Sequence, residues 1–150
     1  MSPFISHMEI SLQEARAAAA RGEVPVGAVL VDPAGRVVAR YGNRTRELSD
    51  PTAHAEVWVI RAACAEARSE RLPGHDLYVT LAPCPACAMV ISAARIARLY
   101  YGAADPKSGG VAQGPRIFSH PQAHHVPEVY DGIRAEEAER LLKDFFVARR

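Results

Sequence analysis

The sequence predicts one α/β domain in which helices cover both faces of a β-sheet. Strand-like segments alternate with helix-like segments along most of the chain, and this order favours a layered α/β/α sandwich over a helical bundle or a barrel. A length of 150 residues lies in the usual range for one domain, and an apolar fraction of 49% supplies one hydrophobic core. We therefore expect residues 1–150 to form a single domain.

The first half of the chain predicts two helices that flank a hairpin. Apolar residues at steps of three or four indicate a first helix that ends before Gly22, and they are Met8, Leu12, Ala15 and Ala19. The valine-rich residues 24–31 and 37–41 predict two strands, because the turn-forming residues 32–35 separate them. Residues 50–52 offer capping chemistry, so a second helix is expected to begin just before His54.

The second half continues the alternation and then becomes less informative. Residues 77–81 predict a strand, residues 84–96 a helix and residues 97–101 another strand. Glycines and polar residues from 102 to 114 indicate a loop, and residues 115–129 predict no element. Residues 134–147 predict a closing helix, with Ala138, Leu141, Leu142 and Phe145 at helical spacing.

Charge and hydropathy narrow the class of protein. The net charge is +1 with 23% charged residues, so the totals show no strongly basic nucleic-acid footprint, and any RNA-binding surface is expected to be local. No apolar run approaches the roughly 20 residues of a membrane-spanning helix, and the N-terminus lacks the pattern of a signal peptide. We expect a soluble, cytoplasmic protein with no membrane partner and no organic cofactor.

Two short motifs carry the chemistry, and each falls at the predicted start of a helix. They are His54-Ala55-Glu56 and Pro83-Cys84-Pro85-Ala86-Cys87. A helix N-terminus favours thiolates, and an i, i+3 spacing places both sulfurs on one side of the first turn. His54, Cys84 and Cys87 are therefore the predicted ligands of one Zn²⁺ per chain, with a fourth position left open as in catalytic zinc sites.

Glu56 is the predicted proton carrier of this site. Residues i and i+2 do not share a helix face, so Glu56 is not expected to bind the metal beside His54. It can instead reach the open position and move the protons that water attack and ammonia release require. A structural zinc site with Cys64 as fourth ligand is the competing interpretation, but within one helix Cys64 lies about 15 Å from His54 along the axis.

The combined H-x-E and P-C-x-x-C pattern resembles the bacterial tRNA adenosine deaminases of the cytidine deaminase superfamily. The likeness covers almost the whole chain, including residues 23–29, 42–44, 50–56, 101–107 and the helix with Phe145 and Phe146. It implies a five-stranded mixed sheet, a homodimer, and the conversion of the wobble adenosine of a tRNA to inosine. The anticodon loop would be the partner, with its target base flipped into the zinc pocket.

The resemblance also implies a set of substrate contacts. Asn43 would bond the purine, Val26 would line the pocket, and Ala55 would belong to the substrate-binding residues. Asp105, Lys107 and Phe146 would meet the RNA. Independent of the resemblance, four arginines flank Asn43 in a stretch without an acid and could follow phosphates, namely Arg36, Arg40, Arg44 and Arg46.

The chain departs from the family pattern close to the metal. The family usually has T-L-E-P-C-x-M-C, whereas Ala82 and Ala86 stand here at the Glu and Met positions. Trp58 occupies a helix position that usually holds a smaller residue, four residues after His54. We interpret Trp58, Ala82 and Ala86 as one altered shell around the metal, in which the large ring fills the volume that the two alanines leave.

Three functions remain open at this point. The first is deamination of the tRNA wobble adenosine. The second is deamination of a free base or nucleoside of the guanine or cytosine type, which the altered shell and the low net charge favour. The third is a catalytically silent RNA-binding or scaffold protein with a structural zinc, which an intact Glu56 disfavours.

Overall fold

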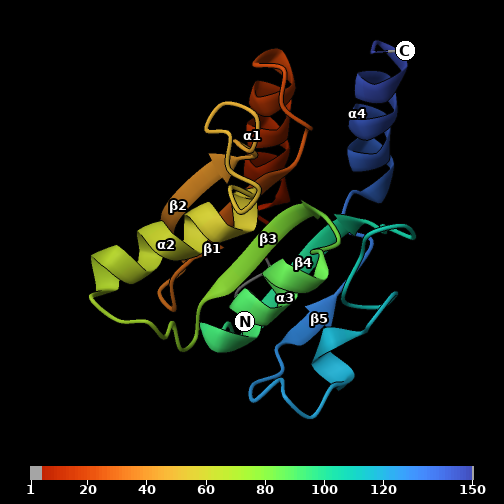
Figure 1. Ribbon diagram of the computed structural model, residues 1–150. Coiled ribbons are helices and arrows are strands. Elements are labelled where there is room, and N and C mark those ends of the chain that lie inside the picture. The colour runs from red at the N-terminus through yellow and green to blue at the C-terminus, as the bar shows by residue number, and fades with distance from the viewer. Residues whose placement is uncertain (1–4, 150) are drawn as a thin grey trace.

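The computed structural model describes residues 5–149 and contains one five-stranded sheet (Figure 1). The strand order is β2-β1-β3-β4-β5, with β1 antiparallel to both β2 and β3, and β4 parallel to both β3 and β5. The strands are β1 (Gly27–Val31), β2 (Val37–Gly42), β3 (Asp76–Leu81), β4 (Arg98–Ala103) and β5 (Glu128–Tyr130). The predicted mixed five-stranded sheet is confirmed.

Four α-helices complete a three-layer sandwich, which is also confirmed. They are α1 (Met8–Ala20), α2 (Ala55–Ala67), α3 (Pro85–Ala93) and α4 (Ala135–Val147). Figure 1 shows α2 and α3 in front of the sheet and α1 and α4 behind it. Along β1 the side chains alternate accordingly: Ala28 and Leu30 belong to the core beneath α2 and α3, and Val29 and Val31 to the core beneath α1 and α4.

Helix α1 lies directly on β1 because Gly27 has no side chain. A Cβ atom at Gly27 would clash with the carbonyl oxygen of Ser11 and would lie 2.5 Å from the backbone nitrogen of Ala15. Both are helix backbone atoms, which cannot move aside as a flexible side chain can. The absence of a Cβ at Gly27 therefore sets how closely the helix approaches the sheet.

The structure corrects some predicted boundaries. Helix α2 begins at Ala55 with His54 as its N-cap, and α3 spans nine residues, with Cys84 as its N-cap. Within the valine-rich residues 24–31, the strand begins only at Gly27. Val24 and Pro25 belong to the segment that connects α1 to β1. Residues 115–129, for which no element was predicted, hold a short 3-10 helix (Ile117–Ser119) and most of β5.

In the described part of the chain, no helix combines the length and the apolar character needed to cross a membrane.

Candidate active site

The N-termini of α2 and α3 meet at one end of the sheet and bring the predicted metal ligands together. His54 and Cys84 are the N-cap residues of these helices, and both have extended backbone conformations. Cys87 lies in the first turn of α3, where its backbone N–H donates to the Sγ atom of Cys84 over 3.5 Å. The positive ends of both helix dipoles thus point at the two sulfurs, which favours their thiolate forms.

The three donor atoms have the separations that a tetrahedral zinc requires. The Nδ1 atom of His54 lies 3.6 Å from the Sγ atom of Cys84 and 3.3 Å from that of Cys87. With Zn–S near 2.3 Å and Zn–N near 2.0–2.1 Å, tetrahedral ligands are about 3.5 Å apart for an N and S pair. Among the described residues, this is also the one His, Cys or acidic cluster that could hold a metal ion.

The two sulfurs differ in their affinity for protons. Hydrogen bonds from the Cys87 thiol and from His54 lower the pKa of Cys84 to about 4. The same contact with Cys84, together with burial, raises the pKa of Cys87. The hydrogen bond to Cys84 raises the pKa of His54 in turn. One thiolate is therefore already favoured at neutral pH, and a cation at this place stabilises the second.

Glu56 lies beside this cluster and is almost fully buried, with 4% of its surface exposed. Burial is the main cause that raises the pKa of its carboxyl group, with the charge of His54 acting in the opposite direction. A raised pKa makes the carboxylate a better proton acceptor than an exposed one, which suits a group that takes up and returns a proton. Its position agrees with the role predicted from the H-x-E spacing.

A pocket of about 290 Å³ opens over the cluster. It is lined by Val24, Val26, Asn43, Thr45, His54, Glu56, Leu81, Ala82, Cys84, Asp105 and Ser108. Four of these residues were not identified from the sequence, namely Val24, Thr45, Leu81 and Ser108. Thr45 is close in sequence to Asn43, and Leu81 is close to the cysteine motif. Their nearness to these predicted site residues was the one feature of the sequence that could have identified them.

The predicted substrate contacts divide into two groups. Val26, Asn43 and Asp105 line the pocket, as their predicted roles require. Lys107 is exposed, and Phe146 is 49% exposed on α4, so both are available to a large ligand rather than to a bound base. Ala55 is fully buried in the core and is not among the residues that line the pocket.

The interpretation of Trp58, Ala82 and Ala86 as one altered shell is wrong. The ring of Trp58 packs against Tyr41 of β2, with ring centroids 5.9 Å apart, and beneath the guanidinium of Arg61. Ala86 is exposed, so no buried volume is left there to fill. Ala82 alone lines the pocket, where a small side chain enlarges the space for substrate.

The arginine stretch also differs from the prediction, because acids from other segments reach it. Arg36 pairs with Asp32 and Glu66, and Arg40 pairs with Glu14 of α1 over 2.8 Å. Arg44 lies 3.6 Å from Glu47 and Arg46 donates to the carbonyl oxygen of Gly22. Since Arg44 and Arg46 lie within three residues of Asn43 in the chain, these two remain the candidates for phosphate contacts.

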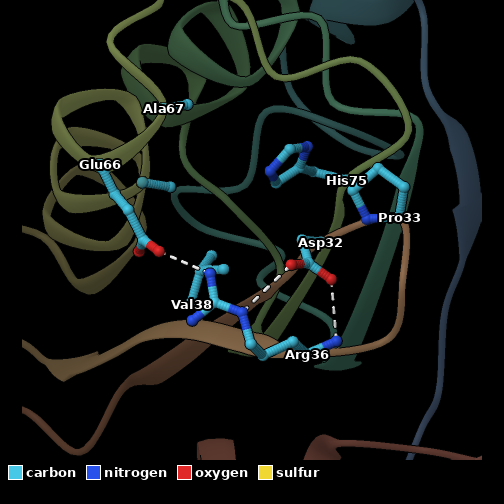
Figure 2. Close-up of a pocket in the computed structure, with 8 residues that line it drawn as sticks. Asp32, Pro33, Arg36, Val38, Glu66, Ala67 and His75 are labelled. Carbon is cyan, nitrogen blue, oxygen red and sulfur yellow. Dashed lines mark hydrogen bonds and ion pairs between the residues drawn. The ribbon is translucent and has the colours of Figure 1, made fainter.

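A second hollow, of about 280 Å³, lies between the turn of the β1–β2 hairpin and the C-terminal half of α2 (Figure 2). Figure 2 shows Arg36 between the carboxylates of Asp32 and Glu66, which it binds. His75 also lines this hollow, with Nδ1 3.0 Å from the carbonyl oxygen of Pro73. Both carboxylates of this hollow are paired with Arg36, and within the described residues it holds no metal-ligand cluster, so the pocket over His54, Cys84 and Cys87 is the candidate active site.

Comparisons with known proteins agree with this assignment. Residues 1–103 match the family described as the cytidine and deoxycytidylate deaminase zinc-binding region. The chain is 60% identical over 143 residues to the tRNA-specific adenosine deaminase of Agrobacterium fabrum, covering 95% of this chain and 93% of that one. The chain belongs to the tRNA-specific adenosine deaminase family. The predicted membership is thereby confirmed.

Solved structures of deaminases share the fold of this chain. The chain is similar, with a TM-score of 0.88 and 61% identity, to a structure from a study of A-to-I editing by tRNA:A34 deaminases at the wobble position of transfer RNA. That match covers 90% of this chain and 97% of the other. A guanine deaminase from Nitrosomonas europaea has a TM-score of 0.82 at 19% identity, with 97% and 87% covered, which shows a shared fold alone.

Proposed function

We propose that this protein is a zinc-dependent hydrolase that converts the wobble adenosine of a tRNA to inosine and releases ammonia. The observation that carries the proposal is a cluster of His54, Cys84 and Cys87 at a pocket that the buried Glu56 also lines. The high identity to a tRNA-specific adenosine deaminase over nearly the whole chain supports tRNA over a free base. The proposal treats residues 1–150 as one deaminase domain that binds one zinc ion.

In this reaction the oxygen of water bonds to the purine C6 atom, and the bond from C6 to the amino nitrogen breaks. His54, Cys84 and Cys87 would hold a zinc ion, which would supply the Lewis acidity needed to make water nucleophilic near neutral pH. Glu56 accepts a proton as water attacks and delivers a proton to the departing nitrogen. Its burial limits contact of the carboxyl group with bulk water.

The walls of the pocket position the base. Val26 and Leu81 offer apolar surfaces to the purine ring, and Asn43 carries the amide that would hydrogen-bond its edge. Lys107 and Phe146 are exposed and suited to RNA outside the pocket, the first by charge and the second by stacking. Asp105 lies at the pocket, where its carboxylate can accept a hydrogen bond from a nucleotide.

We also infer a homodimer that acts in the cytoplasm, where its tRNA substrate occurs. The sequence of α3 contains no charged residue, and its Ala86, Met89 and Ala93 are exposed. An uncharged helix face of this kind suits contact with a second copy of the chain. Sedimentation of the purified protein at twice the mass of one chain would support this inference.

The proposed substrate is tested by presenting tRNA and free bases to the same preparation. Ammonia release should be seen with a tRNA or anticodon stem-loop that carries the wobble adenosine, and the RNA product should contain inosine at that position. Guanine, cytosine and adenosine should release far less. Faster turnover of a free base than of the RNA would replace this proposal with a free-base deaminase.

Loss of one sulfur ligand should remove the metal. Elemental analysis of the purified protein is expected to find about one zinc per chain, and Cys87→Ala should retain almost none after dialysis because two donors bind zinc weakly. Cys64→Ala is the matched control, since Cys64 packs against the core and lies outside the cluster. Stoichiometric zinc in Cys87→Ala would show that the ligand set is wrong.

RNA binding should depend steeply on salt, because arginines displace counterions from phosphates. Arg44→Gln should reduce the slope of log affinity against log salt by about 1 if Arg44 contacts one phosphate. Arg36→Gln is the control, since Arg36 pairs with Asp32 and Glu66 at the second hollow. Equal slopes for the wild type and Arg44→Gln would remove Arg44 from the RNA interface.

A further inference from the structure

One wall of the catalytic pocket is built from two separate segments of the chain. Val24 and Val26 come from the segment between α1 and β1, and Asn43 and Thr45 from the segment that follows β2. We refer to these four residues as the hairpin wall. The backbone N–H of Asn43 donates to the carbonyl oxygen of Val26 over 3.0 Å, and its carbonyl oxygen accepts from Arg21, so the two segments are joined at Asn43.

Glu23 makes a second connection between these segments. It precedes Val24, and its side chain reaches the turn formed by residues 44–50. One carboxylate oxygen accepts from the backbone N–H of Arg46 over 3.1 Å, and the other from that of Glu47 over 2.7 Å. Only 1% of the Glu23 surface is exposed, although Arg46 and Glu47 themselves are exposed.

Among the described residues, the amides of Arg46 and Glu47 have no backbone acceptor within the turn. Within the turn, Leu48 donates to Arg44, Ser49 to Arg46 and Asp50 to Thr45 through backbone groups. Glu23 therefore acts on this turn as a capping residue acts on a helix N-terminus.

Burying a carboxylate is costly unless strong hydrogen bonds compensate, and bonds from N–H groups to a charged acceptor are stronger than neutral ones. Among the described residues, no ion pair to Glu23 is formed: the nearby guanidinium of Arg46 binds the carbonyl oxygen of Gly22 and lies over Phe145. The two amides are thus the groups that hold this charge in place.

The same turn leads to the metal site. The carbonyl oxygen of Asp50 accepts from Ala53, and its side chain accepts from both the N–H and the hydroxyl of Thr52. Two residues later His54 begins α2 as its N-cap. A displacement of the turn would therefore be passed to Thr45 and Asn43 at one end and to His54 at the other. Asn43 is also held by Val26 and Arg21, and His54 by the start of α2.

We infer that Glu23 is a positioning residue for the substrate: its carboxylate fixes the turn and thereby the hairpin wall of the pocket. The identity of the substrate in this role rests on the proposed function. The clamp, by which we mean the two hydrogen bonds from the turn to Glu23, does not depend on it. Glu23 does not line the pocket, so it acts through Asn43 and Thr45 and not by contact with the base.

The test compares Glu23→Gln with the wild type in three measurements. The amide of Gln would face a backbone N–H with its own NH₂ group, so one bond is lost, and amide exchange across residues 45–50 should accelerate roughly tenfold. With an anticodon stem-loop RNA, kcat/KM should fall roughly 10- to 100-fold, mainly through KM. Zinc content should stay unchanged.

Two further variants separate positioning from general destabilisation. Glu23→Asp keeps the charge with a shorter reach and should recover part of the loss in KM. Glu14→Gln makes the same charge change on α1, where Glu14 pairs with Arg40, and should leave KM unchanged. If Glu23→Gln does not fold, amide hydrogen exchange of the wild-type protein tests the inference instead. The amides of Arg46 and Glu47 should exchange slowly, and fast exchange there would overturn the inference.

Failure of this inference differs from failure of the proposed function. Unchanged exchange and unchanged KM in Glu23→Gln would overturn the clamp while RNA deamination persists. If Glu23→Gln alters amide exchange but the wild type does not deaminate the RNA, the inference on the clamp stands and the proposed substrate is wrong. KM would then be measured with the free base that the protein turns over.

Discussion

Glu56→Gln is expected to lose nearly all deaminase activity while it keeps its zinc. The amide has almost the same shape as the carboxylate but can neither accept nor return a proton. General acid–base catalysis contributes about 10²–10⁴-fold per step, and Glu56 serves both water attack and ammonia release, so kcat should fall by at least about 10³-fold. Inosine formation in single-turnover reactions and zinc analysis of the same samples measure both quantities.

A matched control lies on the same helix. Glu66→Gln makes the same change at the C-terminal end of α2, where Glu66 is exposed and pairs with Arg36. It should retain wild-type kcat. Substantial turnover in Glu56→Gln would transfer the proton-carrying role to another group, and loss of zinc in this variant would make Glu56 a ligand.

Gly27→Ala is expected to destabilise the fold more than any ordinary surface change. The added methyl group would meet the backbone of α1 at Ser11 and Ala15, which cannot rotate away. Relief requires that α1 move off the sheet and open the core that Met8 and Leu12 form with Tyr78. Overpacking in cores usually costs about 1–3 kcal/mol, and we expect more than about 3 kcal/mol here because backbone atoms are involved.

Denaturant unfolding of Gly27→Ala beside Gly35→Ala tests this expectation. A Cβ at Gly35 meets nothing within 4 Å, but the residue has φ +89°. It therefore reports backbone strain without a clash, at about 1–2 kcal/mol. Similar losses in the two variants would mean that α1 adapts to the methyl group.

The deaminase chemistry could be predicted from the sequence because the residues of each motif are close together in the chain. His54 with Glu56, and Cys84 with Cys87, each lie in one helix turn, so local geometry already fixes their relation. Most helices and strands followed from the period of their apolar residues. β5 escaped prediction because it has only three residues, all exposed, and thus carries no alternation of buried and exposed positions.

Side-chain partners from distant segments could not be predicted from the sequence. The stretch with Arg36 and Arg40 contains no acid, yet Glu66 and Glu14 reach it from α2 and α1. Trp58 shares a helix face with His54 by spacing, but its ring turns to Tyr41 of β2. Only the fold decides which segment lies opposite such side chains.

The shortness of β5 has a consequence for how copies of this chain meet. An edge strand offers unpaired N–H and C=O groups on which another chain can extend the sheet, and long flat edges promote aggregation. β5 offers only three residues, and Pro127 before it has no N–H to donate. Growth of the sheet at the β5 edge from one molecule to the next is therefore disfavoured, which leaves contacts between side chains as the route to assembly on this side of the molecule.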